Sequence, residues 1–192
     1  MMKITDYHII LASNSPRRKE LLSGIDILYK VRIVSEVDET YPDDLPQELI
    51  PEYLAKKKAA ASFNGLQADE LLITADTIVL LDNKVLGKPK DRNEVELMLR
   101  QLSGKTHLVI TGVCLTSRNK QVSFSDTTKV TFAELNDDEI DYYARNYNPT
   151  DKAGAYGVQE WIGFVGVESL EGSYFNVMGL PIRRVYEAIK EF

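Results

Sequence analysis

The residues of this sequence most able to do chemistry are acids and long cations. Asp76 interrupts the apolar run Leu71–Leu81, which reads as a buried strand, where a carboxylate is rarely found. An unpaired buried carboxylate is costly or becomes protonated, so Asp76 must meet a cation, a metal ion or several hydrogen-bond donors. A structural alternative places Asp76 at a β-bulge, where neighbouring backbone amides satisfy it.

Basic segments elsewhere in the chain could supply partners for an anion. The segment from Ser13 to Arg18 combines two serine hydroxyls and two guanidiniums with Ser15-Pro16, a pattern typical of a helix N-terminus. The free amides and the dipole at such a terminus favour an anion. Lys58 in a predicted helix and Lys88 after a glycine add two more cations. Together these groups favour the binding of phosphates.

A group of acidic residues could share a hard cation with those phosphates. Glu36, Asp38 and Glu39 are carboxylates of the kind that bind Mg²⁺ together with substrate phosphates. With Asp76 they favour metal-assisted attack of water on a phosphoanhydride, in which Asp76 polarises the water. The sequence leaves open which of the three would lie nearest to the metal.

Other common chemistries lack their residues. There are only two histidines, and no Gly-x-Ser-x-Gly, His-Glu-x-x-His, P-loop or Gly-x-Gly-x-x-Gly pattern is present. The single cysteine, Cys114, can form neither an intrachain disulfide nor a thiolate pair for a metal, which favours the reducing cytoplasm. We interpret His107 as a residue that pins the end of a strand.

The elements that must position these residues predict an α/β domain with a mixed, twisted sheet flanked by helices. Asp82-Asn83-Lys84 predicts a tight turn after the central strand. Two late segments, Trp161–Val167 and Ser173–Val177, are also predicted to be strands. The other predicted strands are residues 8–12, 29–34, 71–81, 106–117 and 121–134, and the predicted helices are residues 16–23, 51–63, 91–102, 136–145 and 182–192.

Composition restricts the possible partners. The 192 residues include 23 Lys and Arg against 29 Asp and Glu, so the formal net charge is −6. Nucleic-acid binding depends on clustered positive charge, so this balance argues against a nucleic-acid binder. No apolar run approaches the ~18 residues of a membrane span, and the N-terminal residues lack the apolar core of a signal peptide. We therefore expect a cytoplasmic protein, not associated with membranes, that binds a small anion.

Six motifs of the chain resemble, in the same order, those of the Maf family. The resemblance covers nearly the whole chain, which we expect to be a single domain over residues 1–192. It implies an inosine-triphosphatase-like fold, with two lobes around a central cleft, and a homodimer. The motifs are Leu11–Arg18, Ala75–Val79, Gly87–Pro89, Leu102–His107, Asp151–Gln159 and Gly172–Pro181.

The resemblance also implies an activity. Maf proteins are nucleoside triphosphate pyrophosphatases that cleave between the α- and β-phosphates and use a divalent metal, Mg²⁺ or Mn²⁺. By position, Asp76 resembles the catalytic general base and metal neighbour of the family. Glu39 resembles a second acidic group at the metal.

Further positions match the substrate-binding residues of the family. Ser13, Arg18, Lys58 and Lys88 match its phosphate-binding positions. A glutamine amide can both donate to and accept from the edge of a pyrimidine, which suits a role in base recognition. The positions that resemble the branch preferring dTTP and UTP are Arg17, Thr77 and Gln159.

Two positions depart from the usual pattern of the family. Glu160 follows Gln159 where glycine is frequent, which puts an extra carboxylate beside the expected base pocket. Thr74 stands before Ala75 where glycine is usual, which could alter the backbone of the catalytic strand. The resemblance leaves one alternative function open, a nucleotide-binding regulator of septum formation or cell division with incidental hydrolysis. A regulator has no need of a general base, so Asp76 favours the enzyme.

Overall fold

The computed structural model describes residues 4–33 and 37–192. These residues form two compact units. The first comprises the described residues of Met1–Asp76, Thr111–Asp126 and Gly179–Phe192, and the second comprises Thr77–Ile110 and Thr127–Met178. That the chain is a single domain stays a prediction.

The described strands form one seven-stranded sheet with the order β2-β1-β3-β5-β6-β7, and β4 pairs with β3. β1 is parallel to both β2 and β3, whereas β4 is antiparallel to β3 and β7 is antiparallel to β6. The predicted mixed sheet flanked by helices is thus confirmed. The strands are β1 (His8–Leu11), β2 (Tyr29–Val31), β3 (Glu70–Leu81), β4 (Lys84–Leu86), β5 (Thr106–Thr116), β6 (Gln121–Phe132) and β7 (Val167–Glu171).

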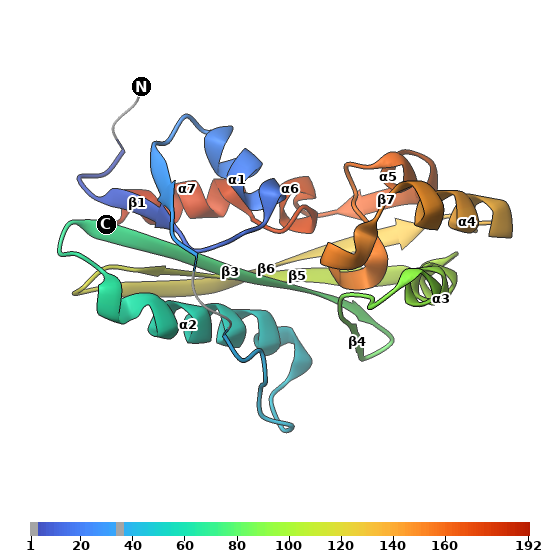
Figure 1. Ribbon diagram of the computed structural model, residues 1–192, viewed down its shortest axis with the longest axis horizontal. Coiled ribbons are helices and arrows are strands. Elements are labelled where there is room, and N and C mark those ends of the chain that lie inside the picture. The colour runs from blue at the N-terminus through green and yellow to red at the C-terminus, as the bar shows by residue number, and fades with distance from the viewer. Residues whose placement is uncertain (1–3, 34–36) are drawn as a thin grey trace. The chain divides into compact units, whose positions relative to one another are not determined.

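The helices of the first unit are α1 (Pro16–Ser23), α2 (Ile50–Ser62) and α7 (Ile182–Lys190). Helix α2 lies on one side of the sheet, and α1 and α7 lie on the other (Figure 1). Helix α1 begins as the sequence predicts, because Pro16 occupies its first position and the Ser15 side chain accepts a hydrogen bond from the Arg18 amide.

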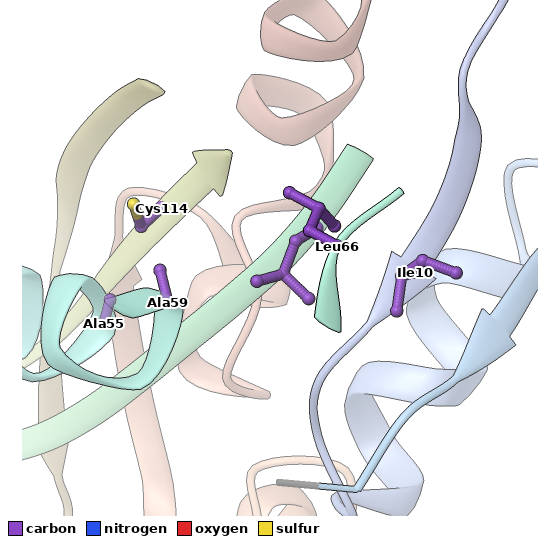
Figure 2. Packing of buried hydrophobic residues seen from close by; sticks show 6 residues of the cluster. Ile10, Ala55, Ala59, Leu66 and Cys114 are labelled. Atoms are coloured by element: carbon purple, nitrogen blue, oxygen red, sulfur yellow. The ribbon is translucent and has the colours of Figure 1, made fainter. Parts of the chain in front are cut away.

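Helix α2 is fixed on the sheet by a buried apolar cluster and two close contacts. Thr74 is fully buried, and its Oγ1 donates to the carbonyl of Ala55 at 2.7 Å. Gly112 in β5 lies so close to α2 that a Cβ there would stand 2.2 Å from the carbonyl carbon of Pro51. Thr74, which stands where glycine is usual in the family, therefore binds β3 to α2. The cluster comprises Ile10, Ala55, Ala59, Leu66, Leu72 and Cys114 (Figure 2).

The second unit contains the helices α3 to α6. Asn136 and Glu139 have the sequence spacing of a capping box, and the box is present at the start of α4, since Asn136 accepts from the Glu139 amide and Glu139 accepts from the Asn136 amide. The predicted turn between β3 and β4 is also present, with Asp82 and Asn83 both at positive φ, as such hairpin turns require. The helices are α3 (Arg92–Leu102), α4 (Asp137–Asn146), α5 (Trp161–Gly166) and α6 (Tyr174–Val177). None of the helices within the described ranges has the length and apolarity needed to cross a membrane.

Two predicted strands were wrong. Residues 161–166 form α5 instead, because a short apolar run has the same composition in a buried helix as in a strand. Residues 174–177 form α6, and Ser173 caps this helix by accepting from the Asn176 amide at 3.2 Å. A serine in front of a short apolar segment is an N-cap signal, so this second helix could have been found in the sequence.

His107 is buried in the second unit, with only 2% of its surface exposed. Its Nε2 lies 2.7 Å from the hydroxyl of Tyr156, and its ring packs edge-on against Phe132 and Tyr156. Burial lowers the pKa of His107 from its ordinary value of 6.5 to about 4. The prediction that His107 pins a strand end is confirmed, because this contact joins the start of β5 to the segment before Gln159.

We expect His107 to make the protein less stable as the pH falls from 6.5 towards 4. In this window the unfolded chain binds a proton at His107 and the folded chain does not, so acid favours unfolding. The free energy of unfolding should fall by about 3 kcal/mol over this window. Urea unfolding at about pH 7.5 and pH 4.5 measures it by comparing wild type with His107→Gln. The exposed His8→Gln variant is the control, and a pH dependence that His107→Gln leaves unchanged would contradict the assignment.

Candidate active site

The residues singled out from the sequence fall in both compact units. Ser13, Arg17, Arg18, Glu39, Lys58 and Asp76 belong to the first unit, and Thr77, Lys88 and Gln159 belong to the second.

Lys58 joins two carboxylates in the first unit. Its Nζ lies 2.5 Å from Oδ1 of Asp76 and 2.8 Å from Oε1 of Glu39. The side chains of Lys58 and Asp76 are only 18% and 13% exposed, whereas that of Glu39 is half exposed. Asp76 thus meets a cation, as its position in an apolar strand predicts.

The packing of α2 on β3 explains why Lys58 reaches Asp76. Thr74 and Asp76 are two positions apart in the strand and share a face, while Ala55 and Lys58 are three positions apart in the helix and share a face. Thr74 binds Ala55, so the next pair along the interface is Lys58 with Asp76. The strand advances about 6.6 Å between its two positions and the helix about 4.5 Å, a difference that a long lysine side chain covers.

The two lysines before Lys58 are used differently. Lys56 pairs with Glu52 at 2.7 Å, one turn earlier in α2. Lys57 lies 3.3 Å from a carboxylate oxygen of Asp38 and donates to the Thr40 carbonyl at 2.9 Å. Of the three consecutive lysines in α2, Lys58 is the one that contacts Asp76.

The same contacts show that Glu39 and its acidic neighbour Asp38 have different partners. The Asp38 carboxylate accepts hydrogen bonds from the amide and hydroxyl of Thr40, which lower the pKa of Asp38. Glu39 instead shares the Lys58 ammonium with Asp76. The remaining candidate, Glu36, lies outside the described residues. Geometry therefore favours Glu39 over Asp38 as the second carboxylate beside Asp76.

Arg18 holds the backbone around Asp76. Its Nε donates to the Gly179 carbonyl and its Nη1 donates to the Ala75 carbonyl, both at 2.8 Å. Burial lowers the pKa of Arg18, and the negative charge of Asp76 opposes that shift. Arg18 thereby connects the first turn of α1 to the residue that precedes Asp76. Its role in phosphate binding, like that of Ser13, stays a prediction.

In the second unit, Lys88 and Gln159 lie in two loops that a backbone hydrogen bond connects. The Gly154 amide donates to the Gly87 carbonyl at 3.1 Å. Lys88 is exposed and makes no ion pair with the described part of the chain. Oε1 of Gln159 is buried and has no hydrogen-bond partner within residues 4–33 and 37–192. Buried acceptors are nearly always paired, so this oxygen suits a donor from a ligand.

Glu160, the carboxylate that follows Gln159, is bound within the protein by two side chains. Its Oε1 lies 3.0 Å from Nζ of Lys152, and its Oε2 accepts a hydrogen bond from the hydroxyl of Tyr143. Lys152 and Tyr143 are both buried. No role was predicted for these two residues, and the only sequence signal was the place of Lys152 in the motif Asp151–Gln159.

A comparison with protein families decides where this chain belongs. The family model described as "Maf-like protein" matches residues 8–192. The chain belongs to the Maf family. It shares 62% identity over 185 residues with a protein of Phocaeicola vulgatus named dTTP/UTP pyrophosphatase, over 96% of each chain. A relative with the same name in Bacteroides fragilis is 59% identical, over 96% of each chain. Another in Porphyromonas gingivalis is 52% identical, over 97% of this chain and 94% of its own.

A more distant likeness exists to a solved structure. A HAM1 protein from Coxiella burnetii aligns with a TM-score of 0.49 and 14% identity, over 97% of this chain and 100% of that chain.

The carboxylates of this Maf protein suit a hard divalent cation. Asp76 and Glu39 bring two carboxylates to the same ammonium, and oxygen ligands are those that Mg²⁺ and Mn²⁺ prefer. No group of three or more His, Cys, Asp or Glu residues able to hold a metal occurs among the described residues. Mg²⁺ commonly binds one or two carboxylates and takes its other ligands from water and substrate phosphates. The residues present fit a metal shared in this way.

Replacing Arg18 tests how much its two hydrogen bonds contribute to the stability of the fold. A lysine cannot reproduce two divergent hydrogen bonds to the carbonyls of Gly179 and Ala75, so Arg18→Lys should lower the free energy of unfolding by about 1 to 3 kcal/mol. The exposed Arg183→Lys in α7 is the matched control. Urea unfolding measures both variants, and equal stabilities would show that the two hydrogen bonds contribute nothing.

Proposed function

We propose that this protein is a nucleoside triphosphate pyrophosphatase, a diphosphatase that hydrolyses dTTP and UTP to the nucleoside monophosphate and pyrophosphate. The observation that carries the proposal is the meeting of Asp76, Glu39 and Lys58, found in a Maf chain whose similar relatives are named dTTP/UTP pyrophosphatases.

The catalytic roles follow from the charges around Asp76. Asp76 accepts the proton of a water molecule that attacks the α-phosphorus, and pyrophosphate leaves. Lys58 lies 2.5 Å from Asp76 and 2.8 Å from Glu39, and the substrate phosphates would give its ammonium a further anionic partner. The other phosphate-binding groups in this proposal are Ser13, Arg18 and Lys88.

Asp76 and Glu39 would hold the metal cofactor, Mg²⁺ or Mn²⁺. When bound, the ion would polarise the phosphate oxygens and neutralise charge that develops on them. The half-exposed Glu39 can adjust to an incoming ion, whereas Asp76 is held in the strand.

Arg17, Thr77 and Gln159 would select the base. The argument for Gln159 is its buried, unpaired Oε1, which suits the N3–H of thymine or uracil. Cytosine carries an acceptor at that position, so it would leave the Gln159 oxygen unpaired and bind less well.

We also propose that the protein is cytoplasmic and forms a homodimer, as the family resemblance implies, and that it binds neither nucleic acid nor membranes. Light scattering of the purified chain tests the dimer directly.

The decisive experiment measures pyrophosphate and orthophosphate released from dTTP, UTP, CTP, GTP and ATP with Mg²⁺ or Mn²⁺. We expect pyrophosphate from dTTP and UTP, and a fall in kcat of about 10²- to 10⁴-fold for Asp76→Asn, because that change removes a general base. The exposed Asp44→Asn variant is the control and should keep wild-type activity. Orthophosphate as the product would refute cleavage between the α- and β-phosphates. Tight nucleotide binding without turnover would favour the cell-division regulator.

Metal binding can be tested without turnover. Lys58 reduces the negative charge offered by Asp76 and Glu39, so Lys58→Met should bind Mn²⁺ more tightly than wild type in the absence of nucleotide, by about tenfold. Lys57→Met, next to it in α2, is the matched control and should change the affinity less. Electron paramagnetic resonance of free Mn²⁺ measures the dissociation constants. A weaker or unchanged affinity in Lys58→Met would place the metal away from these carboxylates.

A further inference from the structure

A polar cluster contacts the turn that carries Gln159, the residue proposed to read the base. Gly157–Glu160, here called the Gln159 turn, is closed by a hydrogen bond from the Glu160 amide to the Gly157 carbonyl at 2.9 Å. Such a bond between the first and fourth residues defines a β-turn, and Gln159 is its third residue. The position of the Gln159 side chain therefore depends on how this turn is held.

Tyr143 binds both ends of the Gln159 turn. Its hydroxyl accepts a hydrogen bond from the Gly157 amide at 3.0 Å and donates to Oε2 of Glu160. The side chain is fully buried and comes from α4. Burial and the neighbouring Glu160 carboxylate raise the pKa of Tyr143, so the hydroxyl keeps its proton as a donor.

Lys152 holds the Glu160 carboxylate from the other side. Its Nζ lies 3.0 Å from Oε1 of Glu160 and 2.7 Å from Oδ1 of Asp151. Lys152 is only 9% exposed, and a buried ammonium requires close anionic partners. Each oxygen of Glu160 is thus bound by a different buried residue, which fixes both the carboxylate and the turn that carries it.

Two glycines allow the turn to pack this closely. A Cβ on Gly157 would stand 2.8 Å from Cδ of Glu160, so only glycine lets the carboxylate fold back over the turn. A Cβ on Gly163 in α5 would stand 1.8 Å from the Val158 carbonyl oxygen, so α5 packs directly against the turn backbone. The turn is therefore held by its polar contacts and by packing.

We infer that Tyr143, Glu160 and Lys152 are positioning residues that fix Gln159 for discrimination between uracil and cytosine. Base reading through one amide requires that the amide be held within a fraction of an ångström. The unpaired buried Oε1 of Gln159 is consistent with an acceptor kept ready for a ligand. This inference rests on the proposed function and adds to its base selectivity three residues that act through the Gln159 turn.

The test compares Tyr143→Phe and Glu160→Gln with wild type for UTP and CTP. Both variants loosen the Gln159 turn, so we expect the KM for UTP to rise about tenfold, with kcat within about twofold of wild type and the KM for CTP unchanged. The matched control is Glu171→Gln, which changes an exposed carboxylate paired with Lys129 at 3.6 Å in the same unit. Thermal unfolding of every variant reports whether the fold is intact.

Binding of UMP and CMP, measured by titration calorimetry, gives a readout that does not depend on turnover. Wild type should prefer UMP, and both variants should lose about tenfold of that preference. A preference unchanged in the variants, an equal loss for both nucleotides, or no preference in wild type would overturn the inference. Loss of the preference in a protein that hydrolyses no triphosphate would keep the inference and refute the proposed function.

Discussion

The ion pair between Lys58 and Asp76 is the interaction on which the first unit depends. A carboxylate in an apolar strand needs a cation at contact distance, and that cation must come from whichever element covers this face of the sheet. Helix α2 covers it, fixed by the hydrogen bond from Thr74 to Ala55 and by the close approach allowed by Gly112. The three contacts support one another, because a shift of α2 along β3 would separate the charges and break the Thr74 hydrogen bond together.

The same arrangement lets one ammonium balance the two carboxylates that the proposed reaction would use. Lys58 pairs with both Asp76 and Glu39. A triphosphate would bring negative charge to the ammonium and so release the carboxylates for a metal and a water molecule. Arg18 adds rigidity where it is needed, since its two hydrogen bonds hold the carbonyls of Ala75 and Gly179. A general base is effective only when its position is defined, and the backbone beside Asp76, the proposed base, is held in this way.

The second unit also contains buried charged and polar groups that need partners, and different residues supply them. There a buried ammonium, a carboxylate and a tyrosine hydroxyl satisfy one another around the turn that carries Gln159. A fully satisfied buried network tolerates little displacement, because moving any member leaves another unpaired in a medium of low polarity. The oxygen of Gln159 is the exception, since it is buried without a partner. Asp76, the proposed catalytic base, and Gln159, the proposed base-reading residue, therefore have separate polar supports, one in each compact unit.

Local signals in the sequence were sufficient for most elements and for the kind of chemistry. The Ser15-Pro16 cap, the capping box at Asn136 and the Asp82-Asn83 turn depend on neighbouring residues alone, and each was predicted correctly. The conflict between Asp76 and its apolar strand likewise predicted a polar partner, although it left open a cation, a metal ion or several hydrogen-bond donors, and several lysines and arginines were candidates for the cation. The two short segments at 161–167 and 173–177 were mistaken for strands. Segments this short are too brief for their hydrophobic periodicity to distinguish a helix from a strand.

Only the tertiary structure decided which residues meet. Lys58 lies 18 positions from Asp76 in the chain, and its choice over Lys56 and Lys57 depends on the rotation of α2 about its axis, which Thr74 and Gly112 set. The pairing of Glu160 with Tyr143 and Lys152 depends in the same way on where α4 packs. Sequence patterns record local backbone preference and the need of a polar group for a partner. The identity of that partner follows from packing between distant segments, which a single sequence does not contain.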